Sequence, residues 1–116
     1  MIRNYEDFEV YKLAYNSAIE VHKKSLEFPK TEQYELASQI RRSTKSIAAN
    51  IAEGHGRMAT EFKRYLTMAK GSATETRVHL CFCKDLGYIT EREYQNLDNN
   101  YTEIIKMLAK LIKVWK

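Results

Sequence analysis

Residues 89–115 read ITEREYQNLDNNYTEIIKMLAKLIKVW and show the clearest helical pattern in the chain. Thr90 is followed three residues later by Glu93, a capping box that marks the start of a helix. Beyond it, apolar side chains recur at alternating steps of four and three residues, at Tyr94, Leu97, Tyr101, Ile104, Leu108, Leu111 and Trp115. This period places them on one helix face. The stretch therefore predicts a helix of about 26 residues, about 39 Å long.

Two helices with similar spacing precede this one. The third helix in chain order is expected to bury a face made of Phe62, Leu66, Ala69, Ala73, Thr76, Leu80 and Cys83. The second, about Glu32 to Glu53, has an apolar face at Leu36, Ile40, Ile47 and Ile51. Beside that face runs a stripe of small polar side chains, Gln39, Ser43, Ser46, Asn50 and Glu53. A solvated face more often carries Lys and Glu, so this stripe predicts tight packing with hydrogen bonds between helices.

The remaining helix and the breaks are less regular. The first helix, about Asp7 to Leu26, is expected to bury Phe8, Tyr11, Tyr15, Ala18 and Ile19. Pro29 ends this stretch, Gly54 and Gly56 end the second helix as C′-type glycines, and Gly87 ends the third. Gly71 lies inside the third helix, where glycine costs about 1 kcal/mol against alanine. Close approach of another backbone would offset that cost.

These elements predict the fold class and exclude several functional classes. Short loops between long helices predict one all-α domain over residues 1–116, an antiparallel up-down-up-down four-helix bundle. The chain has 116 residues, 29% charged, with a net charge of +4. No apolar run is long enough for a membrane span, and the N-terminus lacks the apolar core of a signal peptide. Two cysteines without a secretory signal predict reduced thiols and a cytoplasmic location.

No constellation of residues supports catalysis, so the sequence predicts no enzyme, no cofactor and no metal. No His follows a Glu at the spacing of a di-metal bundle site. Cys81 and Cys83 point to different sides of a helix, so they do not form a paired motif. Because cysteine is among the most buried residue types, both are expected to be buried free thiols. Glu53 and Glu75 are expected to sit in ion pairs with arginines such as Arg41, Arg42 or Arg77.

The basic residues offer the clearest functional signal. Seven of them occupy the second helix, the third helix and the loop between the two, at Arg41, Arg42, Lys45, Arg57, Lys63, Arg64 and Lys70. If the two helices are antiparallel neighbours, several share one end and could bind phosphate. A solvated, soluble surface explains the same charges equally well. The last lysines, Lys106, Lys110, Lys113 and Lys116, fit a helix C-terminal dipole.

The segment Gln39-Ile40-Arg41-Arg42-Ser43, followed by Ser46-Ile47-Ala48-Ala49-Asn50-Ile51-Ala52-Glu53-Gly54, resembles a bacterial family signature. These are the four-helix-bundle proteins encoded in intervening sequences of 23S rRNA genes, which are similar to the accessory protein of diversity-generating retroelements. The resemblance extends through Glu61-Phe62, Ala69-Lys70-Gly71-Ser72 and Leu86-Gly87-Tyr88-Ile89. It implies a ring-like homopentamer without known enzymatic activity. It also implies packing and assembly roles for Ser46, Asn50, Glu53, Gly54, Gly71, Ser72 and Glu75.

Two functions remain in view at this stage. The first is a homo-oligomeric bundle, a pentamer by resemblance, that binds the backbone of RNA or DNA through the seven basic residues. The second is an oligomeric scaffold for a protein partner, in which the same charges only confer solubility. Neither function involves a membrane.

Overall fold

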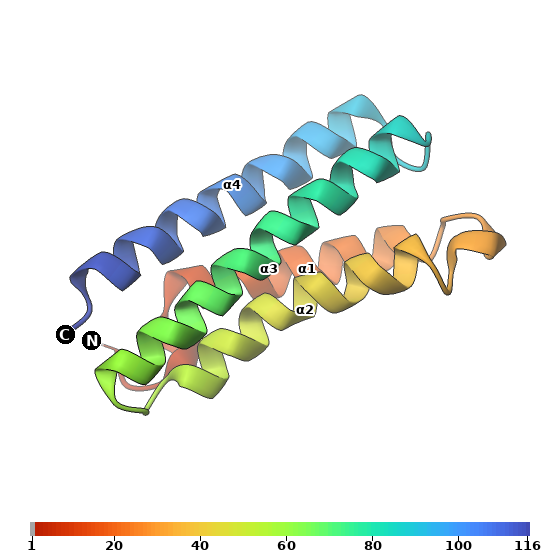
Figure 1. Ribbon diagram of the computed structural model, residues 1–116. Coiled ribbons are helices and arrows are strands. Elements are labelled where there is room, and N and C mark those ends of the chain that lie inside the picture. Colours follow the sequence, from red (N-terminus) through yellow and green to blue (C-terminus); the bar gives the residue numbers. More distant parts are fainter. Residues whose placement is uncertain (1) are drawn as a thin grey trace.

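The computed structural model describes residues 2–116 and shows four long helices (Figure 1). Their bounds are α1 Glu9–Ser25, α2 Leu36–Gly54, α3 Ala59–Asp85 and α4 Glu91–Val114, with short 3-10 turns at Tyr5–Asp7 and Lys30–Glu32. The described residues are 81% helical and contain no strand. Consecutive helices run in opposite directions, which confirms the predicted antiparallel four-helix bundle.

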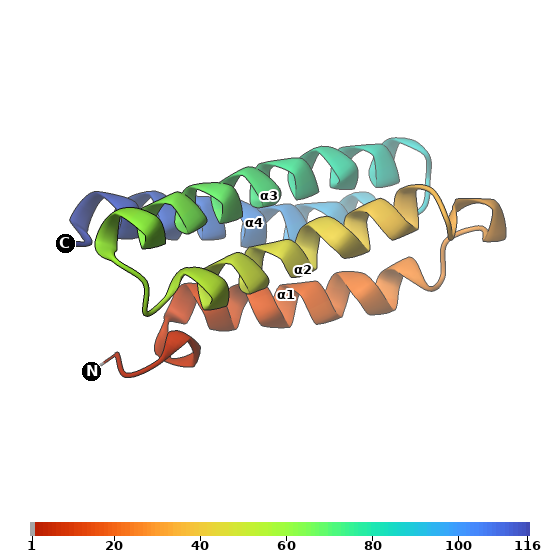
Figure 2. The ribbon, with the colours of Figure 1, turned by 60° about the horizontal axis from the view of Figure 1, so that its bottom comes forward.

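The bundle is elongated, with principal extents of 44 × 24 × 20 Å. α2 lies between α1 and α3, and α4 packs against α3 and α1 (Figures 1 and 2). The two chain ends and the α2–α3 turn lie at one end of the bundle. The α1–α2 connection and the α3–α4 turn lie at the other. We call the end that holds the two chain ends and the α2–α3 turn the α2–α3 turn end.

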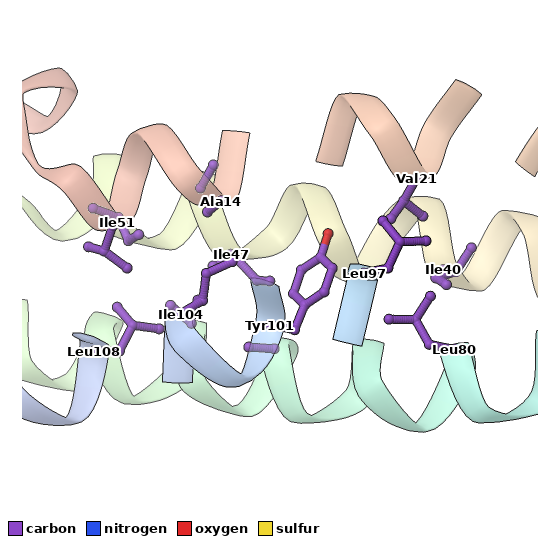
Figure 3. Packing of buried hydrophobic residues seen from close by; sticks show 14 of the residues in the cluster. Ala14, Val21, Ile40, Ile47, Ile51, Leu80, Leu97, Tyr101, Ile104 and Leu108 are labelled. Atoms are coloured by element: carbon purple, nitrogen blue, oxygen red, sulfur yellow. The ribbon is translucent and has the colours of Figure 1, made fainter. Parts of the chain in front are cut away.

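The core confirms the apolar faces predicted for the last three helices. All seven positions of the predicted α3 face are buried, as are the four predicted apolar positions of α2. On α4, Leu97, Tyr101, Ile104 and Leu108 are buried (Figure 3). Tyr94, Leu111 and Trp115 pack against the same core at its margin. Thr90 and Glu93 form the predicted capping box, with bonds of 3.0 and 2.8 Å.

The predicted start of α2 was wrong. Residues 30–32 form a separate 3-10 turn, and the helix begins at Leu36. The cause is a side-chain network that holds the connection in an irregular path. The Gln33 amide donates to the carbonyls of Ser25 and Phe28, at 3.0 Å each. The Arg41 guanidinium donates to the Gln33 carbonyl at 2.9 Å. These bonds supply partners to carbonyl oxygens at the end of α1 and in the connection.

The predicted face of α1 was also wrong in part. Phe8 and Ala18 are buried and Tyr11 is half-buried, but Tyr15 is 51% exposed and Ile19 is 43% exposed. The inward face is made instead of Val10, Ala14, Ser17, Ala18, Val21 and Ser25. α1 thus has two apolar faces. The one with mostly small side chains faces the core.

Three observations bear on the classes of function considered above. No helix within residues 2–116 combines the length and hydropathy needed to cross a bilayer. In the same range, no three His, Cys, Asp or Glu side chains gather as a metal site would require. Both cysteines are free as expected, and Cys83 is buried, but the expected burial of Cys81 was wrong: it is half-buried, with its sulfur 3.3 Å from the Tyr94 hydroxyl.

Candidate nucleic-acid interface

The contact between α2 and α3 positions the candidate residues, most of which lie on these two helices. The hydroxyls of Ser43 and Thr76 are 2.8 Å apart, and those of Ser46 and Ser72 are also 2.8 Å apart. Asn50 donates to the Ser46 carbonyl at 2.8 Å. The predicted bonds between the two helices are thus formed by Ser43 and Ser46, whereas Asn50 bonds back to Ser46 within α2. These bonds fix the register of the two antiparallel helices.

Gly54 lies where α2 and α3 approach each other closely. A Cβ at this position would lie 2.5 Å from the Tyr65 Cβ and 3.1 Å from a Phe62 ring carbon. Gly54 still belongs to the helix, so the expectation that it acts as a C′ glycine is corrected. The left-handed residue of this turn is Gly56, with φ of +91°. Gly54 is thus needed for packing, and Gly56 for the turn that brings α3 back alongside α2.

The other members of the implied assembly set behave differently. Gly71 is exposed, and a Cβ there would meet nothing within 4 Å, so the predicted close approach does not occur within the chain. Glu53 and Glu75 are both exposed, and neither pairs with the arginines expected for it. Arg57 binds Glu53 at 2.8 Å, His79 lies 3.1 Å from Glu75, and Arg77 pairs with Asp98 on α4.

The α2–α3 turn end carries three of the seven predicted cations, Arg57, Lys63 and Arg64. The guanidinium carbons of Arg57 and Arg64 lie 4.9 and 5.1 Å from the centre of the Tyr65 ring, which holds both near one aromatic group. Arg64 also binds Glu61 at 3.1 Å, and this contact lowers the pKa of the Glu61 carboxyl. Lys63 has no carboxylate within 4.0 Å among the described residues. The turn thus presents an arginine–tyrosine cluster beside an unpaired lysine.

The other four predicted cations lie elsewhere. The Arg41 guanidinium donates to the Ser25 hydroxyl at 2.7 Å and to Gln33, so it braces the α1–α2 connection. Arg42 lies on the half of α2 farther from the turn and Lys45 lies at the middle of the helix; both are exposed. Lys70 lies near the middle of α3. The sequence-based expectation that several of the seven share one end therefore holds for Arg57, Lys63 and Arg64.

The C-terminal lysines join this end of the bundle, which the sequence analysis missed. The Trp115 ring packs against Phe62 and His55, with ring centres 4.8 and 6.5 Å apart. These contacts bring the last turn of α4 to the α2–α3 turn. Lys113 and Lys116 flank Trp115 in the sequence. The sequence did place a tryptophan at the end of the α4 apolar face, but residue spacing does not show which helix that tryptophan packs against.

The α2–α3 turn end has an excess of positive charge. Phe8 also packs on His55 and Trp115, at 5.3 and 5.8 Å, so the N-terminal segment belongs to it as well. Residues 3–12, 53–64 and 110–116 together contain eight Lys and Arg against five Asp and Glu. The N-terminal segment contributes three of the acids, whereas residues 110–116 contribute none. The excess therefore comes from the turn and the end of α4, which suits a phosphate backbone.

Comparison with known proteins gives a consistent family assignment. The family model described as 23S rRNA-intervening sequence protein matches residues 6–110. Among solved structures, the chain is similar to a protein of unknown function from the S23 ribosomal protein family of Bacteroides thetaiotaomicron VPI-5482. The two are 29% identical with a TM-score of 0.83, over 90% of this chain and 96% of the other. A search of curated proteins found no match.

Proposed function

The chain belongs to the family of 23S rRNA-intervening sequence proteins, and we propose that it is a non-enzymatic, self-assembling bundle that binds the phosphate backbone of RNA or DNA. The proposal assigns it no catalytic step and no cofactor, and it places the protein in the cytoplasm. The binding surface is the α2–α3 turn end, with Arg57, Lys63 and Arg64 at its centre.

One observation carries the proposal: the packing of Trp115 against Phe62 joins two basic segments that are far apart in sequence. Arg57, Lys63 and Arg64 come from the turn, and the last lysines come from α4. Arginine side chains beside the half-buried Tyr65 ring suit both phosphate and stacked bases. Lys63 supplies a charge that no carboxylate of the described chain neutralises.

Self-assembly would strengthen this weak individual site. One chain carries a net charge of only +4, and its turn end holds several acids. A ring of copies, five by the family resemblance, would place one such end from every copy on the same rim. Repeated sites along one nucleic acid raise the effective affinity without any new contact in a single copy.

Binding of a fluorescently labelled RNA and of a DNA of equal length, measured by anisotropy across a salt series, tests the proposal. Each phosphate that the protein neutralises adds about 0.9 to the slope of log affinity against log salt for duplex, and about 0.7 for single strands. Lys63→Glu should weaken binding and make this slope shallower. Arg92→Glu is the matched control, because Arg92 is an exposed cation at the opposite end of the bundle. Equal effects of the two variants, or a Lys63→Glu slope equal to wild type, would contradict the proposal.

A protein-interaction scaffold is the second candidate, and the opposite end of the bundle favours it. Tyr34 is 94% exposed there, and Leu26 and Leu86 are each more than half exposed. Exposed large apolar side chains around one end are typical of protein contact surfaces. A protein partner captured after nuclease treatment, absent with Tyr34→Ser and retained with Lys63→Glu, would support this candidate against nucleic-acid binding.

A further inference from the structure

An apolar groove of about 440 Å³ runs between α1 and α2 on the surface of the bundle. Its walls are mainly tyrosine and isoleucine from α1 and alanine from α2: Tyr11, Tyr15, Ile19, Ala48, Ala49 and Ala52. Lys45 also lines it, and none of its lining residues is acidic. His22 lines it too, and its Nδ1 is buried without a hydrogen-bond partner within residues 2–116. The single chain therefore leaves this groove incomplete.

The outward side of α3 carries a second apolar surface with helical spacing. Met68, Gly71, Glu75, Val78 and Phe82 follow one another at steps of three and four residues, and all five are exposed. We call these five residues the α3 stripe. Val78 is 50% exposed and Phe82 is 55% exposed. Apolar residues at this spacing on a helix are the usual anchors when a helix lies in a groove.

Gly71 is the strongest sign that the α3 stripe has a partner. Glycine in the middle of a helix destabilises it relative to alanine. No atom of the described chain lies within 4 Å of the space that a Cβ would fill. Gly71 therefore has no packing reason within one chain, in contrast with Gly54. A small residue at the centre of the stripe would let another backbone approach α3 closely.

Charge on the two surfaces is complementary. The groove contains Lys45 and no acid, whereas the α3 stripe contains Glu75 and no Lys or Arg. Next to Phe82, a shallow depression is lined by Glu32 and Glu35. No carboxylate of the described residues lies within 4.0 Å of the Lys45 amine. Opposite charges around two apolar surfaces favour their pairing and disfavour pairing of either surface with itself.

We propose that the α3 stripe of one copy of this chain lies in the α1–α2 groove of a second copy. This inference rests on the self-assembly part of the proposed function and specifies its contact surfaces. Because groove and stripe are different surfaces, the contact is heterologous: each copy offers its own stripe to the next and its groove to the previous one. Such contacts close into a ring or extend into a filament.

Two variants that each block one surface test this pairing. Ala49→Glu places a long acidic side chain in the groove, and Phe82→Glu places one on the α3 stripe. Both positions are exposed, so both variants should fold, which circular dichroism and thermal unfolding will check. Asn99→Glu, at an exposed position on α4, is the matched control. Sedimentation velocity over a protein concentration series gives the mass of each variant and of an equimolar mixture.

The wild type and Asn99→Glu should assemble, and each blocking variant alone should sediment as a 13.6 kDa monomer. Mixing the two variants should double that mass, because the intact stripe of Ala49→Glu can dock in the intact groove of Phe82→Glu. A blocking variant that keeps the wild-type mass would overturn the inference, as would a mixture that stays monomeric. A monomeric wild type would refute self-assembly itself, while the anisotropy measurements would still test nucleic-acid binding independently.

Discussion

Replacing Gly54 by alanine should separate two helices that are in near-contact. The added Cβ would lie 2.5 Å from the Tyr65 Cβ, whereas ordinary contacts of this kind lie between 3.4 and 4 Å. The Tyr65 Cβ is attached to the α3 backbone, so no rotation of a side chain can relieve the clash. The ends of α2 and α3 must therefore move apart by about 1 Å, which overpacking data place at about 1–3 kcal/mol.

Gly71→Ala is the natural comparison because it makes the same chemical change where there is open space. An alanine in a helix interior is favoured over glycine by about 1 kcal/mol. We expect Gly54→Ala to lower the free energy of unfolding by about 2 kcal/mol and Gly71→Ala to raise that of the protomer by about 1 kcal/mol. The two variants should thus differ by about 3 kcal/mol in opposite directions from wild type.

Urea unfolding followed by circular dichroism measures this difference. With a denaturant slope of about 1–3 kcal/mol per molar, the Gly54→Ala midpoint should fall by about 1 M. Each curve is repeated at tenfold lower protein concentration, because self-assembly would make the midpoint depend on concentration. A Gly54→Ala midpoint at or above that of wild type would show that the added Cβ does not force the helices apart. The same conclusion would follow if Tyr65→Gly, which removes the clashing Cβ, left the cost of Gly54→Ala unchanged.

Three further predictions follow from the described contacts. The pKa of the Glu93 carboxyl is lowered from 4.5, first by the Lys24 amine 2.6 Å away and then by the Thr90 amide. The stabilisation that ionised Glu93 provides is therefore present above pH 4.5 and is lost as the pH falls through its lowered pKa. Glu93→Gln should therefore cost about 0.5 kcal/mol at pH 7 and nothing once the wild-type carboxyl is protonated; an equal cost at both pH values would argue against the ion pair. Burial raises the pKa of the Cys83 thiol to about 12, so a thiol reagent at pH 8 should label only Cys81 in the native protein. Peptide mass spectrometry can verify this, and rapid labelling of Cys83 would show that the core opens. The Tyr101 hydroxyl is buried without a partner within residues 2–116, so Tyr101→Phe should leave thermal stability unchanged or raise it by about 1 kcal/mol, and a decrease of that size would reveal an internal hydrogen bond.

Much of the fold could be predicted from the sequence because periodicity and capping are local signals. The α4 capping box and the apolar faces of α2 and α3 needed only residue spacing, and each was confirmed. The start of α2 could not be predicted in this way. It depends on two side chains that reach backbone oxygens eight residues earlier: Arg41 bonds to the Gln33 carbonyl, and Gln33 bonds to the Ser25 carbonyl on α1.

The α1 face and the candidate site show a different limit. Tyr15 and Ile19 have the spacing of a buried face, yet they line an open groove, since periodicity shows that residues share a face but not what covers it. The basic residues were identified by composition, but their grouping was not. Arg41 proved to brace a connection, while Lys113 and Lys116 were brought to the turn by Trp115. Only tertiary packing could decide these placements.

The proposed function has two parts: copies of this chain assemble, and they bind nucleic acid through the α2–α3 turn end. Size-exclusion chromatography with light scattering, recording absorbance at 260 and 280 nm across a salt series, tests both parts together. We expect a species several times the 13.6 kDa chain mass that carries nucleic acid at low salt and releases it as salt rises. A 13.6 kDa monomer with a protein-like absorbance ratio at every salt concentration would contradict this expectation.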